Sequence, residues 1–486
     1  MSHGKRRISA AGAATARAAG RAVAPFSHAG YPRLALAMLA MVLGQGTWAV
    51  TIIFQVMAND GGPAALSGVT AVGAGGLVVF ALVGGVAADS LPPHRVLLAV
   101  CATNTVVVCL VTYLSATQQL ALWQLAAAAF IIFAGVGMFY PSYSASLPRL
   151  LPAEKLLAAN GVEGSARPLL QTAAGPAMAG LLVAAWGPWA GFAAVALCGV
   201  FSVAALLGLE VPSLEQVEKR RRTEVAEAGE AAEADKAPHT DSTAPPVHTG
   251  PINITGIGVE VAGSGAPVEP AAAPRGPFAK VVADLMEGVH YTVRTPWLLG
   301  TLVFAVVAIF FFLGPLEVLL PFVVRDNFGA GEAEFGFLLA VTGVSSAIGA
   351  MITAGLSYPR RYLTLIVLVW GFGTLPLAIV GYTHSWAVMV VILVIVGASD
   401  GIGQVLWGTL LQRRVPGRML GRVSSLDFFV SLLLLPVSMA LVGPLATVMP
   451  IPVIFVIAAI VPAVAAVMVW WIAGMARDEV DNPLRS

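Results

Sequence analysis

The chain has 486 residues, of which 58% are hydrophobic and only 11% are charged. A soluble domain carries about 25% charged residues, so this composition excludes an ordinary soluble globular protein. The 27 Lys and Arg residues nearly balance the 26 Asp and Glu residues, and a net charge of +1 gives no support for nucleic-acid binding. The three cysteines form neither a CxxC pair nor a disulfide framework. We therefore expect a membrane protein.

The first segment, residues 1–33, is rich in Ala and Arg and contains no acidic residue. Transit peptides share this composition. A basic cytoplasmic tail beside anionic lipid headgroups shares it too, and we favour this second interpretation. No apolar h-region precedes the first long apolar stretch, so no cleavable secretory signal is expected.

Twelve apolar stretches follow, and each is long enough for a bilayer about 30 Å thick, which requires roughly 20 residues per helix. They are expected at 34–57, 65–88, 96–116, 120–142, 165–186, 189–209, 298–324, 334–356, 362–383, 387–411, 426–447 and 451–475. The predicted fold is an all-α membrane protein with twelve transmembrane helices in two six-helix bundles, residues 34–210 and 297–476, related by pseudo-twofold symmetry.

The basic residues predict the orientation of these spans. Arg95, Arg149, Arg360 and Arg413 lie in loops on the same side as both termini, whereas the opposite side keeps only Arg325. By the positive-inside rule, both termini are expected in the cytoplasm of a multi-pass protein of the cytoplasmic membrane.

The middle of the chain has a different composition. Residues 211–276 contain basic, acidic and Pro- and Gly-rich stretches that bury too little apolar surface to fold. We expect a disordered cytoplasmic linker, by default a tether between the bundles, with regulation as an alternative. Residues 277–296 have apolar residues near helical spacing and predict an interfacial amphipathic helix. Residues 477–486 are expected to be a cytoplasmic tail.

An internal repeat links the two halves. Residues 147–156 and 411–420 share Leu, Arg, an aliphatic residue, Pro and Leu at the same spacing, and both segments lie in even-to-odd loops. Two halves of equal orientation form a parallel repeat, which predicts a substrate site near the midplane between them.

The loop after the second span reads Gly84-Gly85-Val-Ala-Ala-Asp89-Ser-Leu-Pro92-Pro-His94-Arg95. This segment resembles the signature between helices 2 and 3 of the major facilitator superfamily, although Ser90 replaces a basic residue. The resemblance implies that Gly85, Asp89, Pro92 and Arg95 form a gating motif in which the acid contacts the start of helix 11. A carboxylate is favourable at a helix N-terminus. Alternatively, Asp89 and Arg95 only mark the membrane boundary.

Further fragments resemble the drug- and siderophore-exporting branch of that superfamily. They are Tyr140-Pro141 with Leu147-Pro148, Asp284-Leu285 with Glu287-Gly288, and Leu411-Gln412-Arg413-Arg414-Val415-Pro416. Gly175, Pro176 and Gly180 in the fifth span are similar to the antiporter signature of its exporters, with the final Gly pair broken. Tight helix packing explains these three residues as well as an antiport role does.

Two carboxylates within the spans are informative, because ionisable residues in a membrane are costly. Asp400 lies near the middle of the tenth span and Glu317 in the outer half of the seventh. Either is a candidate for proton coupling, and the alternatives are recognition of a substrate cation or a structural hydrogen bond. Asp427, Glu163 and Arg167 lie near span ends and are expected in interfacial ion pairs.

The superfamily resemblance also implies that helices 1, 4, 7 and 10 line a central cavity. The candidate substrate-binding residues on those helices are Gln45, Trp48, Gln55, Tyr140, Gln404 and Trp407. Aromatic faces beside a carboxylate suit an amphipathic or cationic organic molecule. Trp and Tyr near span ends are also ordinary interfacial anchors.

Several other chemistries find no support in the sequence. The Gly-rich stretches lack a P-loop, no HExxH metal motif is present, and no nucleophile elbow is present. We predict no enzyme activity, no cofactor and no metal. The favoured function is export of a small organic compound by alternating access with proton antiport, in a monomer whose partners are the substrate, protons and the lipid bilayer. A facilitator, an uptake symporter and a non-transporting receptor are the alternatives.

Overall fold

The computed structural model describes residues 24–212, 286–356 and 358–484, and it leaves out the side chains of 82–90 and of scattered positions in two later helices. All described residues except Pro212 belong to one compact unit. The tail at 1–23 and the linker at 213–276 lie outside the described residues. Of the expected amphipathic helix, residues 286–293 are described and are helical, and Glu287 pairs with Arg422 at 2.5 Å.

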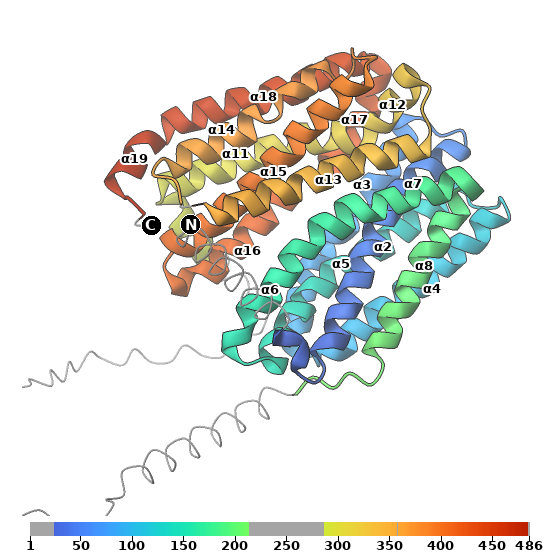
Figure 1. Cartoon of the computed structure of the whole chain (residues 1–486), viewed down its shortest axis with the longest axis horizontal. Coiled ribbons are helices and arrows are strands. Elements are labelled where there is room, and N and C mark those ends of the chain that lie inside the picture. Colours follow the sequence, from blue (N-terminus) through green and yellow to red (C-terminus); the bar gives the residue numbers. More distant parts are fainter. Residues whose placement is uncertain (1–23, 213–285, 357, 485–486) are drawn as a thin grey trace, which may run out of the picture. The chain divides into compact units, whose positions relative to one another are not determined.

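The first half of the unit, coloured blue to green in Figure 1, is helical throughout. Its elements are η1 (Ala24–Ser27), α2 (Tyr31–Ala58), α3 (Pro63–Ser90), α4 (Pro93–Ala116), α5 (Leu122–Leu150), α6 (Ala153–Arg167), the π-helical η2 (Pro168–Ala174), α7 (Gly175–Trp186) and α8 (Pro188–Leu206).

The second half, coloured yellow to red, follows the same pattern. Its elements are α11 (Pro296–Gly314), the π-helical η3 (Pro315–Leu319), α12 (Leu320–Phe328), α13 (Glu332–Gly355), α14 (Tyr362–Phe372), η4 (Leu375–Ile379), α15 (Trp386–Arg414), α16 (Gly417–Leu433), α17 (Leu435–Val448), α18 (Ile451–Ile472) and α19 (Met475–Asp481).

Twelve helices in the described part are long and apolar enough to cross a membrane, and no strand is present there. They coincide with the twelve expected spans, so the predicted all-α membrane fold is confirmed. The fifth and seventh spans are composite, because η2 and η3 interrupt them (Val162–Trp186 and Pro296–Phe328). The pseudo-twofold relation between the halves stays a prediction.

Proline begins several of these helices. Pro63, Pro93, Pro188 and Pro296 each occupy the first position of a helix. The first amides of a helix have no intrahelical acceptor, so the missing N–H costs nothing there, and the fixed φ of proline suits the first turn. Because these prolines start a helix directly after the preceding loop, the loops between the long helices are short.

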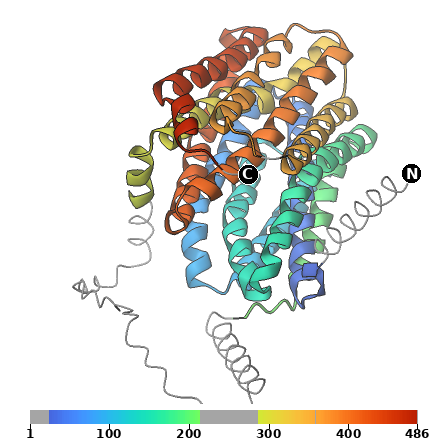
Figure 2. The same ribbon diagram turned by 60° about the vertical axis from the view of Figure 1, so that its left-hand side comes forward.

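Three large apolar clusters show how the halves meet. One cluster lies wholly in the first half and runs from Tyr31 and Leu34 to Leu209, and another lies wholly in the second half and includes Trp297 and Met475. The third draws buried residues from both halves. We call the end of the unit with Arg95, Arg149 and Arg413 the basic end, and the other the opposite end. The halves therefore share one core at the opposite end and have separate cores at the basic end, and Figure 2 shows the two groups of helices from a second side.

Contacts between α3 and α17 join the halves at the opposite end. The Ser67 hydroxyl donates to the Met439 carbonyl, and the Gly443 amide donates to Ser67 Oγ at 3.2 Å. The second junction is between α7 and α13, where a Cβ on Gly336 would lie 2.6 Å from the Pro176 carbonyl oxygen. Only glycine permits so close a backbone approach.

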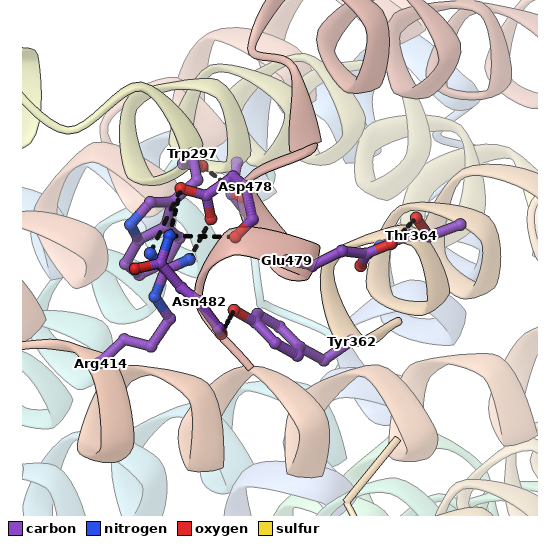
Figure 3. Close-up of polar contacts among 8 residues, drawn as sticks. Trp297, Tyr362, Thr364, Arg414, Asp478, Glu479 and Asn482 are labelled. Carbon is purple, nitrogen blue, oxygen red and sulfur yellow. Dashed lines mark hydrogen bonds and ion pairs between the residues drawn. The ribbon is translucent and has the colours of Figure 1, made fainter. Parts of the chain in front are cut away.

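The C-terminal helix α19 packs against the basic end of the second half and forms polar contacts with it (Figure 3). Arg414 forms an ion pair with Asp478 and lies 4.6 Å from the centroid of the Trp297 ring. Glu479, only 2% exposed, accepts hydrogen bonds from the Thr364 amide at 3.1 Å and from its hydroxyl at 2.7 Å. Thr364 lies in the first turn of α14, so Glu479 satisfies a free amide there. Residues 475–481 are therefore a packed part of the fold, although the sequence analysis treated 477–486 only as a tail.

Candidate functional site

A cavity of about 470 Å³ is lined by residues of both halves. This volume is within the usual range of small-molecule pockets, about 300–1,000 Å³. Its wall is mostly apolar, and its side chains with a hydrogen-bonding group are Gln45, Trp48, Thr70, Asn104, Thr105, Gln171, Thr172, Ser202, Glu317, Thr342, Ser346 and Asp400.

More helices contribute to this wall than the four predicted from the sequence. The predicted helices 1, 4, 7 and 10 correspond to α2, α5, α11–η3 and α15. The observed lining includes residues of these helices and also residues of α3, α4, α7, α8, α13 and α17.

Glu317 lines the cavity from η3, next to Leu316. Its side chain is exposed to the cavity while protein surrounds that space, and it forms no ion pair among the described residues. Single π-helical turns occur frequently at functional sites. The π-turn that begins at Pro315 therefore turns an unpaired carboxylate into the cavity.

Asp400 lines the cavity from α15, where it accepts a hydrogen bond from Ser346 of α13 at 3.2 Å, and Gln404 lies one turn further along the same helix. A Cβ on Gly401 would collide with the Ser346 carbonyl. This glycine allows α13 and α15 to approach closely enough for the hydrogen bond to form.

Among the described residues of the cavity wall, Glu317 and Asp400 are the only acidic ones, and none is Lys, Arg or His. Both come from the second half of the chain. If ionised, they give the cavity a negative charge without compensation from its own wall. The described residues contain no group of three His, Cys, Asp or Glu that could bind a metal ion.

The first half contributes amides to the wall. Gln45 Oε1 accepts from Gln171 Nε2 at 3.1 Å and from the Tyr140 hydroxyl at 3.4 Å. Arg167 lies over the Tyr140 ring, 3.9 Å from its centroid, and pairs with Glu163 at 3.0 Å. Three wall atoms are buried without a hydrogen-bond partner among the described residues: Gln45 Nε2, Trp48 Nε1 and Asn104 Oδ1.

Four of the six predicted substrate-binding residues do not line this cavity. Tyr140 lies behind Gln45, and Gln404 lies one turn beyond Asp400 on α15. Gln55 accepts a hydrogen bond from Ser115 at 2.6 Å and is buried between helices.

Trp407 donates to Asp427 at 3.0 Å and is buried in the core of the second half. The expected interfacial ion pair of Glu163 with Arg167 is confirmed. Asp427 instead accepts this indole hydrogen bond.

The two superfamily motifs lie in different parts of the unit. Pro92 precedes the first residue of α4 and Arg95 is exposed in its first turn, whereas the surroundings of Gly85 and the side chain of Asp89 lie outside the described part. Pro176 lines the cavity, and a Cβ on Gly180 would lie 2.5 Å from the Glu332 carbonyl oxygen. Pro176 and Gly180 therefore lie where α7 meets α13, whereas Gly175 lies against Gly46 of α2.

Eight of the twelve polar side chains of the wall were not predicted from the sequence, and Asn104, Gln171 and Ser346 are three of them. Asn104 and Gln171 are uncharged polar residues in otherwise apolar spans, and buried amides require partners. The sequence contains this signal, but the predicted binding residues were restricted to helices 1, 4, 7 and 10, and these two residues lie in spans 3 and 5. Ser346 had no comparable signal, because serine is common in helix interfaces within membranes.

Comparison with known proteins agrees with this fold. The family model of the Major Facilitator Superfamily matches residues 34–433. The "Uncharacterized MFS-type transporter y4rN" of Sinorhizobium fredii is 30% identical over 192 residues, which are 38% of this chain and 46% of that protein. The "Enterobactin exporter EntS" of Shigella flexneri is 29% identical over 153 residues, 32% of this chain and 35% of that protein. The chain thus matches less than half the length of these relatives.

Solved structures resemble the chain over nearly its whole length. A peptide transporter of the POT family in complex with sulfate has a TM-score of 0.62 at 14% identity, with 93% of this chain and 95% of that chain covered. The xylose transporter XylE of E. coli, solved in an inward-open conformation, has a TM-score of 0.59 at 12% identity, with 90% and 95% covered. These similarities show the transporter fold alone.

Proposed function

Because this chain belongs to the Major Facilitator Superfamily, we propose that it exports a small organic compound across the cytoplasmic membrane by alternating access, driven by proton antiport. One observation carries the proposal. A cavity of drug-like size is lined by both halves of a multi-pass membrane protein and contains two unneutralised carboxylates, Glu317 and Asp400.

Alternating access is supported by the uneven contact between the halves. They share a core at the opposite end, where Ser67 contacts α17 and Gly336 contacts α7, and they have separate cores at the basic end. A rocking transporter requires contacts that form at one end while the other end separates. If the basic end faces the cytoplasm, as the positive-inside rule predicts, this arrangement is an inward-facing state.

Proton coupling is supported by the chemistry of the wall. An ionised carboxylate within a membrane is costly without a partner. Glu317 has no basic partner and Asp400 has only neutral ones among the described residues. Each is most stable when protonated or when paired with a cation, so proton entry and substrate release compete for the same groups.

The wall also limits the substrate. Apolar and aromatic residues such as Trp48, Phe133 and Phe335 surround the two carboxylates. We propose a neutral or cationic amphipathic molecule, because an organic anion would meet acidic side chains and no basic one in this cavity. The similarity to an enterobactin exporter adds siderophores that carry little charge.

Transport into inverted membrane vesicles with an imposed pH gradient tests the proposal. Ethidium and enterobactin are suitable probes, and wild-type protein is expected to accumulate at least one of them only while the gradient lasts. Asp400→Asn and Glu317→Gln are expected to abolish gradient-driven uptake and to leave membrane insertion intact. Asp60→Asn is the matched control, because Asp60 is an exposed carboxylate in a loop with φ of 55°, which Asn also adopts readily.

The alternatives make different predictions in this assay. Probe flux that ignores the pH gradient indicates a facilitator, and accumulation only with the gradient reversed indicates uptake by symport. A non-transporting receptor would move no probe, and its signal in cells would depend on residues 211–276. Wild-type flux and pH dependence in both carboxylate variants would refute proton antiport through this cavity.

A further inference from the structure

The π-helical segment η3 begins where the backbone of the seventh span cannot complete its hydrogen bonds. Pro315 has no amide hydrogen to offer the carbonyl of Phe311, which lies four residues earlier. Within a membrane, polar side chains of neighbouring helices stabilise the backbone at such an interruption.

Ser438 of α17 binds the backbone at this interruption, at the carbonyl that precedes the one left without its helical donor. Its hydroxyl donates to the Phe310 carbonyl at 2.5 Å, and the residue is only 4% exposed. Gly314 permits the approach, because a Cβ there would lie 2.5 Å from Ser438 Oγ and 3.0 Å from the Ser438 carbonyl oxygen. Ser438 therefore binds the last turn of α11, directly before the π-turn that carries Glu317.

The same stretch of α17 forms the junction with the first half. Met439, the residue after Ser438, accepts the Ser67 hydroxyl through its carbonyl, and the Gly443 amide donates to Ser67 Oγ one turn later. A displacement of α3 against α17 at the opposite end thus acts on the backbone that carries the Ser438 side chain.

We infer that Ser438 is a positioning residue for Glu317, and that it transmits the contact between the halves at Ser67 to this carboxylate. The inference rests on the proposed function of Glu317 and deepens it. While Ser67 is bonded to α17, Ser438 stabilises the π-turn and Glu317 faces the cavity. When that contact opens, the turn relaxes toward an α-helix.

The geometry gives the consequence of that relaxation. Successive residues of an α-helix are about 100° apart around the axis. Removing the one extra residue of a π-turn therefore rotates Glu317 by about 100° relative to α11. Such a rotation moves the carboxylate from the cavity toward a neighbouring helix, so its access to the cavity would depend on the state of the opposite end.

The test measures where residue 317 points, independently of transport. Cys101, Cys109 and Cys198 are replaced by Ser, Glu317→Cys is introduced, and the rate of modification by a small charged methanethiosulfonate is measured in permeabilised membranes. A neutral hydrogen bond corresponds to a shift of about two- to tenfold in an equilibrium. We expect Ser438→Ala and Ser67→Ala each to reduce the rate by at least about twofold, while Ser438→Thr retains the hydroxyl and the wild-type rate.

Thr301→Ala is the matched control. Thr301 also donates a side-chain hydrogen bond to a backbone carbonyl, that of Trp297 at 2.8 Å, and it lies in the span that carries Glu317 but far from η3. An unchanged rate in Ser438→Ala, or an equal loss in Thr301→Ala, would overturn the positioning role. An effect of Ser438→Ala without one of Ser67→Ala would overturn the link between the halves. Folding is checked by size-exclusion chromatography, and Ser438→Thr keeps the test informative if the alanine variant fails to fold.

Failure of the proposed function would give a different combination of results in the transport assay and the modification assay. In the vesicle assay, Ser438→Ala is expected to change the pH profile of uptake by protein that retains Glu317. If Glu317 does not couple protons, this pH profile stays constant while the modification rate of Cys at position 317 still responds to Ser438. The two proposals are therefore separated.

Discussion

The close contact between α13 and α7 allows a quantitative prediction for Gly336→Ala. A Cβ at Gly336 would lie 2.6 Å from the Pro176 carbonyl oxygen, so the backbones must separate by about 0.8 Å to reach the 3.4 Å of an ordinary contact. Overpacking of this kind costs about 1–3 kcal/mol. If the opposite end opens during transport, as proposed, this contact is lost there and the whole cost falls on the closed state. We then expect the ratio of closed to open protein to fall by about 5- to 150-fold.

Electron-spin distance measurements detect this shift. Spin labels at Thr117→Cys and His384→Cys, both exposed in loops of different halves, report the separation at the opposite end after the native cysteines are replaced. Gly336→Ala is expected to add a longer-distance population. Gly355→Ala is the control, since Gly355 lies in the same helix and a Cβ there would meet nothing within 4 Å. If both variants give the wild-type distance distribution, the inference that this contact stabilises the closed state of the opposite end is wrong.

Two further predictions concern the second half. Glu479→Ala removes both hydrogen bonds to Thr364 and leaves its amide without an acceptor. We expect the free energy of unfolding to fall by about 2–3 kcal/mol and the melting temperature in detergent to fall with it. A melting temperature equal to that of the wild type would contradict the role of α19 as a cap for α14. Gly401→Ala is expected to push α15 away from the Ser346 carbonyl and to reduce vesicle uptake at least about tenfold by weakening the Asp400 contact. Gly408→Ala, on the same helix with nothing within 4 Å, should transport normally, and similar uptake by both variants would count against this reasoning.

The amino-acid sequence was sufficient for the twelve spans and for the two carboxylates. A run of about 20 apolar residues has few alternatives to a membrane helix, so the spans follow from length and composition alone. Glu317 and Asp400 could be recognised because a charge within such a run is costly wherever the helix lies. Neither inference depends on which helices are neighbours.

Tertiary structure alone decided which polar residues reach the cavity. Gln45 and Gln55 lie on the same helix, yet Gln45 lines the cavity and Gln55 bonds to Ser115 between helices. Spans that are apolar on all sides carry no periodic signal for their rotation about the axis, so this distinction is absent from the local pattern. The direction of Glu317 likewise depends on Ser438, which is 121 residues away in the chain and meets the η3 turn only after the helices pack.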